Sequence, residues 1–362
     1  MKPLLITALL LFVSICFGAD MNAVSDRREK DMRLYRLDRN NDGFLTPEEW
    51  NIREDTFKKY DTDGDGKLSK EELEKFPVTG VPWKGRVVSN VVYKTAGGKP
   101  QLMDIYYPEN FIKESAPAVI LIHGGGWTTG SKSGAGNPQH LGVFEKLSAA
   151  GIICASINYR LIDFDGDLLI SDCVTDAKDS IRYLVKHAAE LGIDSERIAV
   201  FGNSAGGHCS QIIGLSSPES FPGAPELADI HPQIAAIAVW YGRSDFVDWD
   251  PDKTKPNRYA GRIGGAYEEI PDVYRALSPI YLISSNSPPL ILFHGENDSS
   301  LHISQSRRMK TRGDEAGATI EYIEVKNAGH NWRNAGGTPQ PSIAEIQQVT
   351  ADFLIRNLIE TR

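Results

Sequence analysis

A short serine-centred pattern contains the residue types needed for nucleophilic chemistry. Residues 202–206 read Gly-Asn-Ser-Ala-Gly, between an apolar run at 198–201 and a helical stretch. In this context a G-x-S-x-G sequence places the serine on a strained turn between a strand and a helix, where the glycines let neighbouring backbones pack closely. The helix directs its positive N-terminus towards the same place. The pattern therefore predicts Ser204 as a nucleophile, with a purely structural turn as the alternative.

An acid and a base follow in the order that such a serine needs. Asp298 comes just after the apolar run 290–293, and His330 follows the last predicted strand, 319–325. We expect His330 to take the proton of Ser204 and return it to the leaving group, while Asp298 fixes the histidine tautomer. Glu296 is the alternative acid. Bracing, structural or pocket-lining roles are expected for the competing histidines, which are His123, His208, His294 and His302.

A run of three glycines upstream offers backbone donors for a developing negative charge. Residues 123–127 read His-Gly-Gly-Gly-Trp, after the apolar run 119–122. Glycine lets the backbone approach a substrate and aim its N–H groups at it. We therefore predict an oxyanion hole formed by Gly125, Gly126 and the amide of Ala205. The alternative, an ordinary glycine-rich turn, is less consistent with a position upstream of the serine.

Two acidic segments near the N-terminus, 38–49 and 61–72, share the spacing of a calcium loop. Oxygen donors alternate around a tight turn, a glycine stands at the sixth position and a glutamate at the last, which is the EF-hand pattern. Two such loops in tandem favour calcium binding, in a structural role, over a merely solvated acidic stretch. The predicted ligands are Asp38, Asn40, Asp42, Phe44 and Glu49 in the first loop, and Asp61, Asp63, Asp65, Lys67 and Glu72 in the second, with Phe44 and Lys67 acting through their carbonyls.

The elements that must position these residues suggest two domains joined by a linker. Residues 20–76 form the predicted EF-hand pair, 77–85 a linker rich in proline, and 86–362 a catalytic domain. In the last of these, strands alternate with helices such as 172–191 and 303–316, which is typical of a mainly parallel sheet with helices on both faces. The expected strands are 87–93, 102–107, 118–122, 152–157, 198–201, 234–240, 290–293 and 319–325, the first two forming a hairpin.

The N-terminus and the overall charge indicate where such a protein acts. Residues 1–19 combine Lys2 with an apolar run from 4 to 17, which predicts a signal peptide and a secreted or periplasmic protein. A retained anchor and lipidation of Cys16 are the alternatives. No other segment is long and apolar enough to cross a bilayer, so no stable span is expected after cleavage. The net charge of -9 argues against a nucleic-acid partner.

The catalytic segment resembles a known family over residues 86–360. The matching stretches are 123–127, 157–160, 176–184, 193–208 and the segments around Asp298 and His330. They are similar to α/β-hydrolase carboxylesterases related to the hormone-sensitive lipase group, especially bacterial acetylxylan and feruloyl esterases. The resemblance implies an eight-stranded α/β-hydrolase fold, the triad Ser204, Asp298 and His330, and a carboxylic ester as substrate, such as one linked to a polysaccharide, with no catalytic cofactor. The alternatives are a serine peptidase or amidase of the same fold and a non-catalytic, calcium-dependent binding protein.

Overall fold

The computed structural model describes residues 42–47, 49, 57–58, 61–69, 72, 83–112, 115–163, 166–248 and 259–360. The chain divides into two compact units, Met1–Gly80 and Val81–Arg362. The predicted signal peptide at 1–19 lies outside the described residues. Within them, no helix has the length and apolar character needed to span a membrane.

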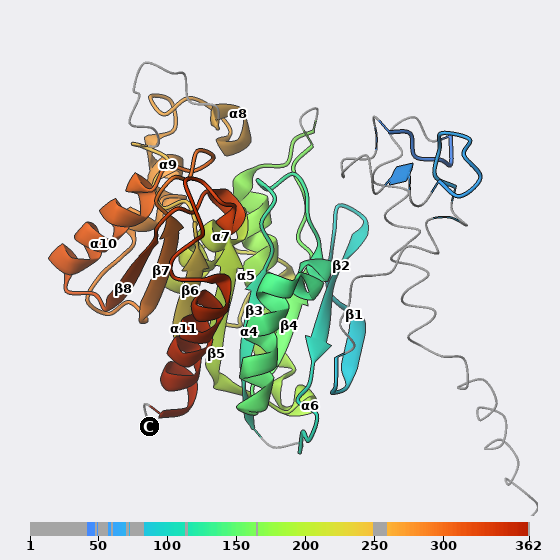
Figure 1. Cartoon of the computed structure of the whole chain (residues 1–362). Helices are drawn as coiled ribbons and strands as arrows, with labels where there is room; N and C mark the ends of the chain where they lie inside the picture. The colour runs from blue at the N-terminus through green and yellow to red at the C-terminus, as the bar shows by residue number, and fades with distance from the viewer. Residues whose placement is uncertain are drawn as a thin grey trace, which may run out of the picture. The chain divides into compact units, whose positions relative to one another are not determined.

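An eight-stranded sheet forms the centre of the larger unit, counted over the described residues, with the strand order β1-β2-β4-β3-β5-β6-β7-β8 (Figure 1). The first two strands and the contact of β2 with β4 are antiparallel, and the other pairs are parallel. The predicted mainly parallel sheet is therefore confirmed. The strands are β1 (Val87–Ala96), β2 (Lys99–Tyr106), β3 (Ala116–Ile122), β4 (Ile153–Ile157), β5 (Ile193–Asn203), β6 (Ala236–Trp240), β7 (Leu290–Gly295) and β8 (Ile320–Val325).

Helices cover both faces of the sheet because its central strands are buried on both sides. In β3, Val119 and Leu121 join one apolar cluster and Ile120 and Ile122 join the other. Helices α4 and α11 cover the first face, and α5 and α7 cover the second (Figure 1). The α-helices are α4 (Pro138–Ala149), α5 (Ile170–Lys186), α6 (Ala188–Leu191), α7 (Ala205–Leu215), α8 (Ala260–Ile263), α9 (Pro271–Ala276), α10 (Ser304–Ala316) and α11 (Ile343–Ile355).

Turns and short helices connect the main elements of the larger unit. The β1–β2 hairpin turns at Gly97 and Gly98, whose φ angles of 59° and 73° suit glycine in a two-residue turn. The predicted helix 172–191 is in fact two helices, because the backbone at His187 leaves the helical conformation (φ -102°, ψ 16°). The 3-10 helices are η1 (Lys132–Gly136), η2 (Pro225–Leu227), η3 (Pro279–Tyr281) and η4 (His330–Trp332), and η5 (Arg356–Glu360) is a π-helix.

Candidate active site and calcium loops

Ser204 occupies the turn between β5 and α7, as its sequence context predicts. Strand β5 ends at Asn203, helix α7 begins at Ala205, and Ser204 between them has a φ of 53° and a ψ of -119°. A positive φ is strained for a residue with a side chain. The amide of Ser204 donates to the carbonyl of Trp240 on β6 at 2.9 Å, which holds the turn against the next strand.

The two glycines that flank this turn are required by close packing. A Cβ atom on Gly206 would lie 1.9 Å from the carbonyl oxygen of Ile122 on β3. A Cβ atom on Gly202 would lie 2.3 Å from the carbonyl oxygen of Gly206. Neither backbone atom can move aside as a flexible side chain would, so the strand and the helix reach this approach only with glycine at both positions.

His330 and Asp298 complete a hydrogen-bonded chain that begins at Ser204. The His330 Nε2 atom lies 3.0 Å from the Ser204 Oγ atom, and the His330 Nδ1 atom lies 2.7 Å from the Asp298 Oδ2 atom. Asp298 follows β7 and His330 begins η4 after β8, so the ends of β5, β7 and β8, in one half of the sheet, position the three side chains. The structure thus brings the predicted triad together at hydrogen-bonding distances.

Asp298 is held rigidly in its ionised form. Its Oδ1 atom accepts the amides of Ser300 and Leu301 at 2.8 and 2.9 Å. Burial raises the pKa of the Asp298 carboxyl, but hydrogen bonds from His294 and His330 outweigh burial and hold that pKa well below its usual range. The acid therefore remains an anion that can orient His330 and stabilise its positive form.

Sequence reasoning missed the part that His294 plays beside the acid. Its Nε2 atom lies 2.8 Å from the carbonyl of Leu301 and 3.4 Å from Asp298 Oδ2, and its Nδ1 atom lies 2.7 Å from Ser306 Oγ. The only signal in the sequence was its position at the end of a buried strand, four residues before the acid. Because its Nε2 atom lies close to both Leu301 and Asp298, His294 supports the turn that carries the acid.

The other expected competitors lie in different surroundings. Glu296 is exposed, and its carboxylate accepts the amide of Asn327 at 3.4 Å. His208 is buried on α7, with its Nε2 atom 2.8 Å from the carbonyl of Leu277. His302 is exposed and accepts the amide of Ser304. The two ring nitrogens of His330 contact Asp298 and Ser204, which supports Asp298 over Glu296 as the acid.

The glycine run lies beside the serine and is tied to it by Asn203. The Gly124 amide donates to the Asn203 Oδ1 atom at 3.1 Å. Gly125 and Gly126 have φ angles of 122° and 61°, which glycine adopts readily. His123 is buried and stacks on Tyr159 at 4.3 Å between ring centroids, so it braces this loop as the sequence suggested.

A pocket of about 440 Å³ opens over these groups. All three predicted oxyanion-hole residues line it together with Ser204 and His330, which is the arrangement that an acyl-transfer site needs. The lining residues are Gly125, Gly126, Trp127, Asn203, Ser204, Ala205, Arg243, Tyr259, Arg262, Ser300, Leu301, His330 and Asn331. Neither Arg243 nor Arg262 was predicted as a site residue from the sequence, although the loop 245–267, which contains Arg262, was expected to form part of the pocket wall.

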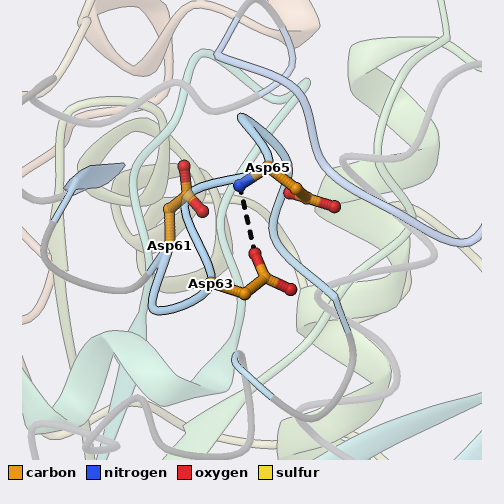
Figure 2. Close-up of side chains that lie close together, drawn as sticks. All are labelled: Asp61, Asp63 and Asp65. Atoms are coloured by element: carbon orange, nitrogen blue, oxygen red, sulfur yellow. Dashed lines mark hydrogen bonds between the residues drawn. The ribbon is translucent and has the colours of Figure 1, made fainter.

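In the smaller unit, the second acidic loop gathers three carboxylates at one point. Oxygen atoms of Asp61, Asp63 and Asp65 all lie within 4.8 Å of one another (Figure 2). One oxygen, Asp61 Oδ1, is buried and accepts no hydrogen bond. Buried carboxylate oxygens normally have partners, so this one is suited to a cation. The three aspartates therefore fit a hard divalent ion such as calcium.

The two loops are paired, and their last glutamates make further contacts. Leu45 and Leu68 exchange backbone hydrogen bonds of 3.0 and 2.8 Å. Glu72 accepts the amide and the hydroxyl of Ser69, both at 2.9 Å, and Glu49 accepts the amide of Thr46 at 3.0 Å. These contacts have the T-x-x-E and S-x-x-E spacings of a capping box, which is recognisable in the sequence.

The predicted calcium ligands are therefore only partly brought together. Glu72 lies outside the group of three aspartates because its Oε1 atom accepts the amide and hydroxyl of Thr62, at 2.6 and 3.0 Å. Burial raises the pKa of Glu72, but its hydrogen bonds with Ser69 and Thr62 lower that pKa to about 2. In the first loop, Asp38 and Asn40 lie outside the described residues.

A serine on a strand-to-helix turn, followed in the chain by an aspartate and then by a histidine, is the arrangement typical of the α/β-hydrolase class. The BD-FAE family model matches residues 103–312, more than half of the chain. The chain therefore belongs to the BD-FAE family. An EF-hand family model matches residues 30–51 and 52–77, which confirms the predicted EF-hand pair.

Relatives of known name agree with this assignment. Esterase LipQ of Mycobacterium tuberculosis is 31% identical over 71% of this chain and 60% of its own length. Esterase LipC of the same organism is 29% identical over 64% of this chain and 57% of its own length. The matches thus span less than two thirds of these two relatives. Both relatives are named esterases, which agrees with the predicted class of carboxylic ester hydrolase.

Solved structures show the same architecture. The apo form of Thermogutta terrifontis esterase 2 has a TM-score of 0.62 at 27% identity, over 76% of this chain and 95% of that one. The butyrate-bound form of the same esterase also has a TM-score of 0.62, over 77% of this chain and 94% of that one. The predicted α/β-hydrolase fold is therefore confirmed.

Proposed function

We propose that this protein is a secreted or periplasmic serine carboxylesterase that works through an acyl-enzyme. The observation that carries the proposal is the hydrogen-bonded chain from Ser204 through His330 to Asp298, in a pocket lined by the glycine run. The names of the relatives support an ester substrate. Because those matches are partial, the activity of the whole protein is our inference.

The geometry suggests a two-step reaction. Ser204 Oγ attacks the ester carbonyl carbon while His330 Nε2 takes its proton, and the tetrahedral intermediate collapses as His330 returns that proton to the departing alcohol. Water then attacks the acyl-serine by the same route in reverse, which releases the carboxylic acid and restores Ser204. Asp298 remains ionised throughout and holds the His330 Nδ1–H towards itself.

Backbone donors stabilise the negative charge that forms on the carbonyl oxygen. Gly125, Gly126 and Ala205 line the pocket together with Ser204, and the N-terminus of α7, which begins at Ala205, adds a favourable dipole. Because the Asn203 side chain accepts the amide of Gly124, the glycine run stays fixed relative to the turn that carries Ser204. Such preorganised donors are each worth roughly a hundredfold to a thousandfold in kcat.

For the substrate, we propose acetyl or feruloyl esters of polysaccharides. The support is the sequence resemblance to acetylxylan and feruloyl esterases, together with a pocket of about 440 Å³ that is large enough for either acyl group. The test is a panel of acetylated and feruloylated oligosaccharides set against simple acyl esters and peptide amides. Faster cleavage of the oligosaccharide esters is expected, and exclusive cleavage of amides would favour the peptidase alternative.

We also propose that the EF-hand pair binds calcium in a structural role and that the protein is exported. The convergence of Asp61, Asp63 and Asp65 supports the first point. In a calorimetric titration of the whole protein, calcium should bind to the wild type, and the Asp63→Ala variant should bind it more weakly. No heat at millimolar calcium would contradict the proposal.

Export is tested separately, by sequencing the N-terminus of the protein released from its natural host. Cleavage near residue 19 is expected.

A further inference from the structure

The strand between the nucleophile and the acid contributes no member of the proposed triad. Ser204 follows β5 and Asp298 follows β7, and β6 lies between these two strands in the sheet. The residue that follows β6 is Tyr241. Its amide donates to the carbonyl of Phe293 on β7 at 2.7 Å, while the carbonyl of Trp240 accepts the amide of Ser204 at 2.9 Å. Tyr241 is therefore fixed between the turn that carries the serine and the strand that leads to the acid.

The Tyr241 side chain packs directly against the proposed base. The ring centroids of Tyr241 and His330 lie 4.7 Å apart, at an interplanar angle of 57°. Tyr241 is only 1% exposed, whereas the His330 side chain is 18% exposed and lines the pocket. The phenol ring therefore covers part of the imidazole, and the remaining part is open to a bound substrate.

A second aromatic ring holds Tyr241 in place. Trp332 lies two residues after His330 in η4 and is buried, and its ring centroid lies 4.6 Å from that of Tyr241 at an angle of 74°. Trp332 in turn packs on Trp240, with 5.7 Å between the ring centroids. Tyr241 thus contacts two side chains of the same short helix, and one of these two is the proposed base.

Tyr241 and Trp332 have backbone conformations that bulky residues rarely adopt. Their φ angles are 41° and 58°. A positive φ at an aromatic residue is unfavourable, and it persists only where the surrounding structure imposes it, most often at functional sites. Burial alone does not require it, since Tyr107 is buried without a positive φ. The strain at Tyr241 and Trp332 therefore points to a role in the site beyond core packing.

The hydroxyl group of Tyr241 is not suited to proton transfer. Burial raises its pKa above the usual value for tyrosine, although a hydrogen bond with Asn203 opposes that rise. The hydroxyl therefore stays neutral at the pH values at which an esterase of this kind works. Any contribution of Tyr241 to the reaction must act through the position of His330, against which its ring packs.

We propose that Tyr241 is a positioning residue, whose ring holds the His330 imidazole in the orientation that proton transfer needs. This inference rests on the proposed esterase function. The two hydrogen bonds of His330, at 3.0 Å to Ser204 and 2.7 Å to Asp298, fix its nitrogens but leave the ring free to tilt about the line that joins them. The packed phenol ring removes that freedom, so the imidazole stays aligned with the serine hydroxyl.

Steady-state kinetics of the full-length protein with 4-nitrophenyl acetate test the proposal. Misplacing a catalytic group by about 1 Å can cost on the order of a hundredfold in rate, so Tyr241→Leu should lower kcat about tenfold to a hundredfold. KM should change little, because Tyr241 is not among the described residues that line the pocket. Tyr241→Phe keeps the ring and should restore most of kcat. Tyr241→Met, whose flexible side chain fills irregular gaps, should lose kcat as Tyr241→Leu does.

Tyr107→Leu is the matched control. Tyr107 is 2% exposed and follows β2, and its ring packs on Phe111, which lies outside the described pocket lining. This substitution should lower the melting temperature, as Tyr241→Leu does, but it should leave kcat unchanged. The comparison separates the loss of core packing from the loss of the histidine position.

The outcomes separate this inference from the proposed function. A folded Tyr241→Leu or Tyr241→Met protein with the kcat of the wild type would overturn the positioning role, and so would equal losses in Tyr241→Phe and Tyr241→Leu. Failure of both the leucine and the methionine variants to fold would overturn it too, because the ring would then serve the fold. A wild-type protein that cleaves no ester would instead overturn the proposed function itself.

Discussion

Replacing Asp298 by asparagine tests the assignment of the acid. The Asp298 Oδ2 atom lies 2.7 Å from His330 Nδ1, while Oδ1 accepts the amides of Ser300 and Leu301. Asparagine retains the oxygen that those amides need, so the turn should keep its shape. However, an amide in place of Oδ2 favours the wrong tautomer of His330. We expect kcat for 4-nitrophenyl acetate to fall roughly a thousandfold to ten-thousandfold near neutral pH.

That loss corresponds to about 4 to 5.5 kcal/mol of transition-state stabilisation. Glu296→Gln is the matched control, because it makes the same chemical change two residues away on the rival acid. The control should retain nearly full activity, since Glu296 is exposed and its carboxylate accepts only a weak hydrogen bond of 3.4 Å from Asn327. If Asp298→Asn loses less than about tenfold, or if Glu296→Gln loses as much, the assignment of the acid is wrong.

Three further predictions concern stability and calcium. Burial lowers the pKa of His208 to about 4 from 6.5, so stability should decline by up to about 3 kcal/mol as pH falls from 6.5 to 4. His208→Gln should remove that part of the slope in urea unfolding, and an unchanged slope would contradict this. Gly206→Ala should lower the melting temperature and abolish activity, because its Cβ would meet the Ile122 carbonyl at 1.9 Å, whereas Gly261→Ala, with open space around it, should do neither. Calcium should raise the melting temperature of the wild type more than that of Asp63→Ala, and equal shifts would refute loop binding.

Much of the fold could be predicted because its strands are short apolar runs. Strand β7 (Leu290–Gly295) is buried along its whole length, and its sequence shows this directly. The start of strand β5 was harder to predict. The strand begins at Ile193, but the residues that follow, 194–197, are mostly charged and partly exposed. Ile193 belongs to the sheet because it pairs with Ala116 on β3. The pattern of apolar and polar residues around Ile193 does not reveal this pairing.

The triad was predictable for a related reason. Each member follows a recognisable strand, and the carboxyl ends of neighbouring parallel strands meet at one edge of the sheet. By contrast, the contact of Arg262 with Gly126 joins residues that are 136 positions apart, on segments without strong periodicity. Likewise, His294 is recognisable as a support for Asp298 only once the acid turn is folded. Loop contacts of this kind depend on tertiary packing. The local patterns that predict strands and helices do not reveal them.

The central claim is that Ser204 is the nucleophile, and covalent labelling tests it most directly. The full-length protein is incubated with diethyl 4-nitrophenyl phosphate, and the adduct is located by peptide mass spectrometry. We predict one diethylphosphoryl group per chain, on Ser204, with loss of esterase activity in step with labelling, and neither labelling nor activity in Ser204→Ala. A label on a different residue, or a Ser204→Ala variant that still hydrolyses 4-nitrophenyl acetate, would contradict the account.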